Sequence, residues 1–262
     1  MTTTTADHPL IELQRVTKQF TGVTAVADVS LAISPGQVLC LLGHNGAGKS
    51  TIIKILSGVY APTEGTMLID GEAASLGGPR DALDRGIATV HQGAGTVPLM
   101  SVARNFFLGA EPTKGRGLFR RFDAATAARV ALQEIQHLGI RRIRDAGQLV
   151  GTMSGGERQA LVIARALHFG ARVLILDEPT SALGVHEAEI VLQAVETARD
   201  RGVGVVLITH QAHHALRVGD HFAVMAHGRL VASFARGEKE AAEVIDLMAG
   251  GAAMEELERK QA

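Results

Sequence analysis

Cysteine and aromatic residues are scarce in this chain of 262 residues. It has one cysteine, one tyrosine and no tryptophan, and aromatic residues make up 3% of it. Because Cys40 has no second cysteine to pair with, an internal disulfide is excluded. Cys40 lies in the apolar run Gln37–Leu42, where we expect its thiol to pack as a small hydrophobic group. This cysteine usage suits a reducing compartment.

Excess charge is also absent, since the formal net charge is −1 at pH 7. Domains that bind nucleic acid usually carry a basic face, so the composition gives no electrostatic argument for such a partner. The small basic run at residues 141–144 is interpreted as a solvated helix end.

Long apolar runs are missing as well. None approaches the roughly 18 residues that a membrane-spanning helix needs. If the protein works at a membrane, we therefore expect another chain to supply the spanning helices. Residues 1–9 are rich in threonine and lack the basic start and apolar segment of a secretory signal, and we expect a disordered tail there.

The segment Gly43–Thr51 is the most informative part of the chain. It fits the pattern G-x-x-x-x-G-K-[ST] at every fixed position. Glycines let the backbone turn tightly and bring N–H groups close to phosphate oxygens. Lys49 supplies a cation for the β- and γ-phosphates, and Ser50 supplies a hydroxyl for Mg²⁺. The residues expected to bind a nucleotide are Gly43, His44, Asn45, Gly46, Ala47, Gly48, Lys49, Ser50 and Thr51.

The rest of the pattern predicts an α/β fold. Alternating polarity over Ile11–Phe20 and Val26–Ile33 is typical of antiparallel strands with one exposed face. Further strands are expected over residues 37–42, 66–70, 87–90, 172–176 and 202–209, with a hairpin over 222–225 and 229–234. Helices are expected over residues 50–57, 81–85, 123–138, 154–169, 185–201, 212–218 and 238–260. We predict a mostly parallel sheet, with only loops and helices over residues 93–170.

Two carboxylates follow an apolar strand at Val173–Leu176. In a phosphate-loop fold such a strand runs beside the loop and delivers an aspartate to the Mg²⁺ shell, a role that Asp177 fits. A carboxylate at Glu178 can accept a hydrogen bond from the water that attacks the γ-phosphate. The alternative is a polar strand exit before Pro179, which is less favoured once the loop at Gly43–Thr51 is considered.

Together these features resemble the ATP-binding cassette family, and further stretches extend the resemblance over about Leu10–Phe234. They are Met153-Ser154-Gly155-Gly156-Glu157 (the family signature), Gln92 (the glutamine loop), Ser181–Gly184 (the dimer-facing loop), His210 (the switch histidine) and Phe20 (an aromatic ring under the adenine). The several motifs agree in order and spacing, which is far more specific than any one of them.

The resemblance implies the phosphate-loop ATPase fold of that family. Its ATPase domain would span residues 10–235, with 10–92 and 171–235 forming the core and an antiparallel β subdomain, and 93–170 a helical subdomain. Residues 236–262 would be a C-terminal helical extension. Two copies of the chain would enclose two ATP molecules, each held by one phosphate loop and by Ser154, Gly155 and Gly156 of the other copy. Gln92 would bind Mg²⁺ or water, and His210 would contact the γ-phosphate. The implied catalytic set is Glu178, His210, Lys49 and Gln92, and the metal set is Ser50, Gln92 and Asp177.

Three positions depart from the family pattern. Glu157 replaces the usual glutamine of the signature, which leaves the contacting serine and glycines in place. Gly184 replaces the usual aspartate of the dimer-facing loop, which weakens an expected contact between chains. Phe20 replaces a tyrosine and retains the stacking face.

Residues 90–92 and 97–109 resemble the monosaccharide importers of the ribose, xylose and fructose type. This implies a homodimer on the cytoplasmic face of the inner membrane. Permease subunits would dock near Gln92–Leu108, and a periplasmic solute-binding protein would take part indirectly. Two alternatives remain: a soluble cassette acting in translation or DNA repair, and an ATP-binding module with poor hydrolysis. A metal site at His210, His213 and His214 is disfavoured, because no cysteine or acidic cluster accompanies them.

Overall fold

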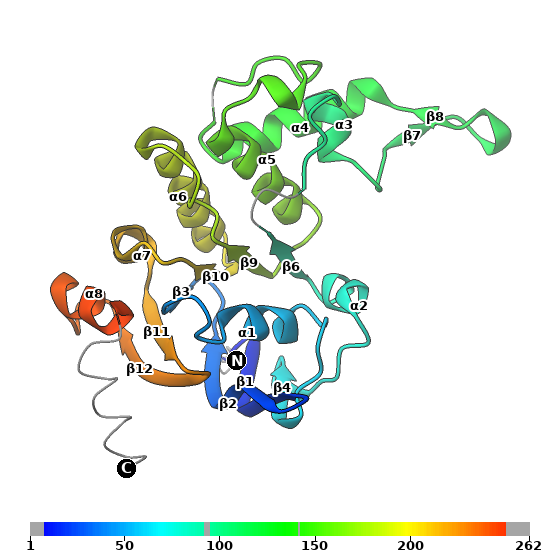
Figure 1. Ribbon diagram of the computed structural model, residues 1–262. Coiled ribbons are helices and arrows are strands. Elements are labelled where there is room, and N and C mark those ends of the chain that lie inside the picture. Colours follow the sequence, from blue (N-terminus) through cyan, green and yellow to red (C-terminus); the bar gives the residue numbers. More distant parts are fainter. Residues whose placement is uncertain (1–7, 92–94, 141, 250–262) are drawn as a thin grey trace, which may run out of the picture. The chain divides into compact units, whose positions relative to one another are not determined.

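The computed structural model describes residues 8–91, 95–140 and 142–249 (Figure 1). Contacts divide the chain into two compact units. Unit 1 takes the described residues up to Thr89, from Ala171 to Glu178 and from Ala198 onward, and unit 2 takes Val90–Gly170 and Pro179–Thr197. Both large sheets belong chiefly to unit 1, whereas unit 2 is mainly helical.

The first sheet is antiparallel. Its strands, in spatial order, are β2 (Val23–Ile33), β1 (Ile11–Phe20), β4 (Glu64–Ile69) and β5 (Glu72–Ala73). The predicted alternation is present in β1, where Ile11, Leu13 and Val16 are buried. A register shift between Leu13 and Val16 adds one residue to the spacing, so both side chains remain on the buried face.

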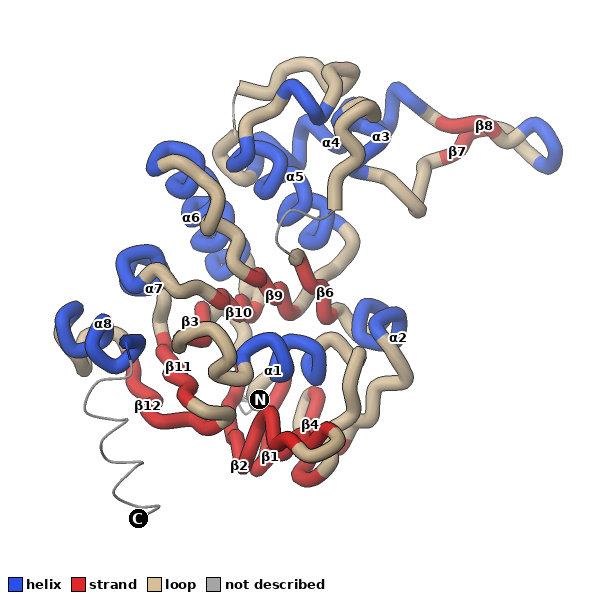
Figure 2. The backbone as a smooth tube through the Cα atoms, viewed as in Figure 1, coloured by secondary structure: helices blue, strands red, loops and turns tan. Residues whose placement is uncertain are grey.

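The second sheet carries the parallel strands (Figure 2). Its order is β12 (Arg229–Ala235), β11 (His221–Ala226), β3 (Val38–Leu42), β10 (Gly204–Ile208), β9 (Val173–Asp177) and β6 (Ile87–Val90). β3 runs parallel to both β10 and β11, and β12 returns antiparallel to β11. Every residue of β3 and β10 is buried, as expected for central strands covered on both faces.

The helices of unit 1 are α1 (Lys49–Leu56), α2 (Pro79–Asp84), α7 (Ala212–Val218) and α8 (Ala241–Ala249). The sequence pattern placed a helix over residues 238–260. Of that range, residues 241–249 form α8, and residues 250–262 lie outside the described part of the chain. Among the described residues, no helix combines the length and apolar character that crossing a membrane requires.

Unit 2 holds α3 (Val102–Phe106), α4 (Ala124–His137), α5 (Gly155–His168) and most of α6 (Val185–Asp200). Short 3₁₀ turns lie at Gly117–Phe119 and Val150–Thr152. Asp123 caps α4, because its side chain accepts a hydrogen bond from the Thr126 N–H. Phe106 is fully buried, and its ring contacts those of Phe107 and His168.

The expectation of only loops and helices over residues 93–170 is wrong at one place. Two short strands, β7 (Thr113–Lys114) and β8 (Arg121–Phe122), pair there as a hairpin. A two-residue strand is too short to show an alternating pattern in the sequence, so nothing distinguished this pair from a loop.

Leu41 offers a test of the central strand β3. The Leu41 side chain is 1% exposed and lies within the hydrophobic core of unit 1. Leu41→Ala should lower the free energy of unfolding by about 2–5 kcal/mol, because it removes buried methyl groups and leaves a cavity. Leu83→Ala is the matched control, since Leu83 is 57% exposed on α2. Urea unfolding of both variants measures the difference, and equal losses would contradict the assignment of Leu41 to the core.

Candidate functional site

The loop between β3 and α1 is shaped by three glycines. Gly43, Gly46 and Gly48 have φ angles of 135°, 85° and 104°, in the region that favours glycine. A Cβ on Gly43 would lie 2.2 Å from the carbonyl oxygen of Met225, and one on Gly48 would lie 2.8 Å from that of Ala25. At Gly46 a Cβ would meet nothing within 4 Å. Backbone conformation alone therefore explains Gly46, whereas neighbouring strands also require glycine at the other two positions.

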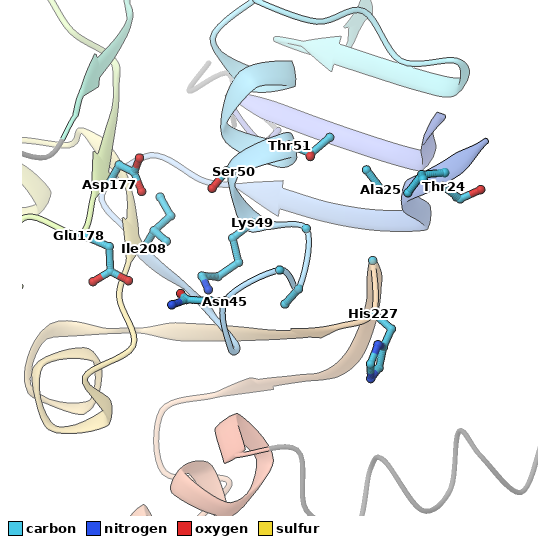
Figure 3. A pocket seen from close by; sticks show the side chains of 15 residues that line it. Thr24, Ala25, Asn45, Lys49, Ser50, Thr51, Asp177, Glu178, Ile208 and His227 are labelled. Carbon is cyan, nitrogen blue, oxygen red and sulfur yellow. The ribbon is translucent and has the colours of Figure 1, made fainter. Parts of the chain in front are cut away.

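A cavity of about 510 Å³ lies against this loop (Figure 3). Its walls come from β2, the loop, the start of α1, the ends of β9 and β10, and the β11–β12 turn. The lining residues are Val23, Thr24, Ala25, Asn45, Gly46, Ala47, Gly48, Lys49, Ser50, Thr51, Asp177, Glu178, Ile208, His227 and Gly228. All of them belong to unit 1.

Strand register brings Asp177 to this cavity. We expected the strand before Asp177 to run beside the loop, but β10 lies between β9 and β3. Ile208 of β10 pairs with Leu41 on one side and with Asp177 on the other. Because the three strands are parallel and in register, their carboxyl ends share one edge of the sheet, the position at which open α/β sheets bind ligands.

Lys49 places a cation at the cavity. Its Nζ donates hydrogen bonds to the carbonyl oxygens of Gly43 (2.6 Å) and His44 (3.0 Å). Burial lowers the pKa of Lys49, while the nearby carboxylates of Glu178 and Asp177 act in the opposite direction. An ammonium group held over a loop of backbone N–H groups is suited to binding an anion such as phosphate.

Ser50 and Asp177 both line this cavity, and they supply a hydroxyl and a carboxylate. Hard oxygen donors of this kind are the ligands that Mg²⁺ prefers, with water and phosphate oxygens completing its shell. The residues present therefore fit the metal that the sequence predicted.

Glu178 and His210 are in direct contact. His210 Nδ1 lies 2.9 Å from Glu178 Oε2, with the Glu178 side chain 16% exposed and that of His210 56% exposed. The Glu178 N–H donates to the carbonyl oxygen of Ile208, which extends the pairing of β9 and β10 by one residue. Glu178 has a φ of 50°, an uncommon angle for a residue with a side chain and one that is often retained at functional sites.

The signature residues lie in unit 2, at the start of α5. Ser154 Oγ accepts a hydrogen bond from the Glu157 N–H, and Glu157 Oε2 accepts one from the Ser154 N–H. This reciprocal pair is a capping box, which a glutamate closes as well as a glutamine does. A Cβ on Gly155 would lie 2.5 Å from Leu183 Cδ2, and one on Gly156 would lie 2.4 Å from the Glu187 carbonyl oxygen. The backbone of α6 therefore requires glycine at 156, whereas the neighbour of Gly155 is a side chain of the loop before α6.

Other predicted site residues lie elsewhere. Phe20 is 41% exposed and packs edge-on against Tyr60, with Lys18 Nζ 5.4 Å from its ring centroid. Phe20 is not among the residues that line the cavity, and its contact with adenine stays a prediction. His44 Nδ1 lies 2.7 Å from the Asn45 carbonyl oxygen. Gln92 lies outside the described residues.

His227 lines the cavity and was missed by the sequence reasoning. The pattern placed it in a hairpin turn, which the structure confirms. Its position beside the phosphate loop follows from the pairing of β11 with β3, which no local pattern reveals. Its ring also packs against that of His44, with centroids 5.5 Å apart.

Comparisons with known proteins agree with this geometry. The family model described as "ABC transporter" matches residues 26–181. The fructose import ATP-binding protein FrcA of Rhizobium meliloti is 38% identical over 227 residues, covering 86% of this chain and 87% of that protein. The ribose import ATP-binding protein RbsA of Burkholderia pseudomallei (strain K96243) is 38% identical over 93% of this chain, which spans only 47% of that relative's length.

Solved structures show the same fold. A dimeric ATP-binding cassette in a post-hydrolysis state, bound to ADP and Pi, has a TM-score of 0.70 at 25% identity, covering 87% of this chain and 100% of that one. The ADP conformation of another ATP-binding cassette of an ABC transporter has a TM-score of 0.77 at 23% identity, covering 91% of this chain and 95% of that one. The predicted α/β cassette fold, with an antiparallel sheet and a mostly parallel one, is therefore confirmed.

Gly48 and Gly46 form a matched pair for testing the loop. Both have positive φ, but only a Cβ at Gly48 would meet protein atoms. Gly48→Ala should therefore lower the free energy of unfolding by about 1–3 kcal/mol more than Gly46→Ala does. Chemical denaturation without nucleotide measures this difference, and equal stabilities would show that the β2 backbone does not restrict Gly48.

Proposed function

This chain belongs to the ABC transporter family, and from that premise we propose that it is the ATP-hydrolysing subunit of a bacterial importer for a monosaccharide. One observation carries the proposal: the phosphate loop, Ser50, Asp177 and Glu178 line one cavity of unit 1, and His210 contacts Glu178. The names of the fructose and ribose relatives support a sugar as the transported substrate.

Each side chain has a distinct task in ATP hydrolysis. Lys49 and the loop N–H groups bind the β- and γ-phosphates, and Ser50 and Asp177 hold Mg²⁺, which neutralises charge on those phosphates. Glu178 accepts the hydrogen bond of the attacking water, and His210 orients the Glu178 carboxylate through their 2.9 Å contact. This contact also argues against a module that binds ATP without hydrolysing it.

A second copy of the chain completes the site in this proposal. The cavity in unit 1 holds the triphosphate of ATP, and Ser154, Gly155 and Gly156 of the partner copy contact the γ-phosphate. The backbone N–H groups and positive dipole end of α5 suit an anion. Dimeric cassettes among the solved structures, at 25% and 26% identity, support this arrangement.

The proposed location is the cytoplasmic face of the inner membrane, bound peripherally to permease subunits. Those subunits dock on the segment Gln92–Leu108 of unit 2, and a periplasmic solute-binding protein delivers the sugar. Within the described part of this segment, Leu99 is 85% exposed, so its side chain is available for contact with another chain. The importer is favoured over a cassette in translation or DNA repair by the names of the relatives.

Glu178→Gln tests the catalytic assignment. The amide cannot take a proton from the attacking water, so steady-state ATP turnover should fall by at least about a hundredfold. ATP binding should persist, and ATP-dependent dimers should accumulate in sedimentation experiments. Glu72→Gln on β5 makes the same charge change at an exposed position and should leave turnover at the level of the parent chain. Unchanged turnover in Glu178→Gln would falsify the assignment.

Leu99→Asp tests the docking segment. A buried carboxylate at an apolar interface is strongly unfavourable, so a tagged Leu99→Asp chain should lose co-purification with a multispanning membrane protein. Its ATP binding should be unchanged. Phe119→Asp is the control, because Phe119 is equally exposed at 85% but lies outside the segment. Recovery of the tagged parent chain only from ribosomes would contradict the importer.

A further inference from the structure

The carboxylate of Glu187, a residue of α6, already accepts a hydrogen bond from the first turn of α5. The Gly155 N–H donates to Glu187 Oε1 at 2.8 Å, and the nearby Gly156 N–H helps to lower the pKa of this carboxylate. The third N–H of the turn, that of Glu157, donates to Ser154 Oγ at 3.2 Å. The N–H groups of Gly155 and Glu157 therefore have acceptors within unit 2 before any phosphate arrives.

The same carboxylate also holds the start of α6. Its Oε2 accepts a hydrogen bond from the N–H of Gly184, the residue before α6, at 3.2 Å. Gly184 has no side chain with which to cap the helix, and the hydrogen bond from its N–H to Glu187, three residues later, is one half of a capping box. One side chain thus joins Ser154–Gly156, the signature loop, to Ser181–Gly184, the dimer-facing loop.

Glu187 is an anion under ordinary conditions. The backbone N–H groups of Gly184 and Gly155 hold its pKa below the usual value for a glutamate, and the positive charge of Arg158 acts in the same direction. The carboxylate therefore satisfies the signature loop in the way that a phosphate oxygen would, with charge-assisted hydrogen bonds.

We propose that Glu187 is an internal competitor for the phosphate site of the signature loop, and that it must leave Gly155 and Gly156 before the partner's γ-phosphate can bind there. This inference rests on the proposed function, in which two copies enclose ATP. Its departure also frees the Gly184 N–H, so ATP capture at the signature loop releases the dimer-facing loop in the same step.

Electrostatic repulsion determines whether removal of the Glu187 charge strengthens or weakens the ATP-bound dimer. A carboxylate and a γ-phosphate on the same N–H groups repel each other, and that repulsion is strong where water is excluded. Arg158 remains beside the site after the carboxylate has left and compensates part of the incoming charge. Removal of the Glu187 charge should therefore tighten the ATP-bound dimer, whereas the loss of a merely structural contact would weaken it.

The test compares variants in the Glu178→Gln chain, in which ATP stays bound. Sedimentation velocity at saturating ATP and Mg²⁺ gives the dimer dissociation constant. Adding Glu187→Gln should lower this constant by at least about fivefold, because a neutral amide competes less well for the N–H groups. Glu189→Gln makes the same charge change at an exposed position of α6 and should leave the constant unchanged.

A second variant separates competition from helix capping. Glu187→Ala combined with Gly184→Asp removes the carboxylate from α5 and gives α6 a capping side chain at its N-terminus. Because an aspartate at 184 also supplies the expected contact between chains, Gly184→Asp alone is the reference for this variant. The combined variant should melt near the temperature of that reference and bind its partner more tightly than the reference does, as Glu187→Gln does relative to its own parent. A constant that is unchanged or raised in both variants overturns the inference while the proposed function stands. Monomers at every concentration in all variants, the parent included, overturn both.

Discussion

The close approach of two backbone segments to the phosphate loop is the constraint from which this architecture follows. Met225 at one side and Ala25 at the other leave no room for a Cβ at Gly43 and Gly48. The loop can therefore begin at the buried end of β3 and turn directly into α1. Parallel pairing then places the ends of β9 and β10 at the same edge, so carboxylates 128 and 129 residues beyond Lys49 line the same cavity as Lys49 does.

In unit 2, hydrogen bonds between glutamate side chains and helix N-termini hold the starts of α5 and α6. Backbone N–H groups at the starts of α5 and α6 lack helical partners, and glutamates within the first turns accept from them. Glu157 serves its own helix, whereas Glu187 serves two helices at once. At both departures from the family pattern, 157 and 184, a glutamate three residues into a helix accepts a hydrogen bond from the backbone N–H at the start of that helix.

Many of the strands and helices could be predicted from local sequence. Continuous apolar runs identified β3, β9 and β10, and the capping residues Asp123 and Ser154 marked the starts of α4 and α5. Long-range pairing was harder. The sequence could not show that β10 separates β9 from β3, nor that the turn at His227 reaches the loop, because both facts depend on strand order. The bridge formed by Glu187 was equally hidden, since a side chain makes it between residues 32 positions apart in the sequence.

The contact between Glu178 and His210 restricts which sequence changes β9 and β10 can accept. Because the carboxylate is displayed one residue beyond β9, and His210 two residues beyond β10, their meeting depends on the number of residues in each strand. Apolar residues within these strands can exchange for one another at moderate cost. Deletion or insertion of a single residue in either strand would instead shift one partner by about 3.3 Å. Substitutions among apolar residues of β9 and β10 should therefore be compatible with activity, whereas insertions and deletions in these strands should not.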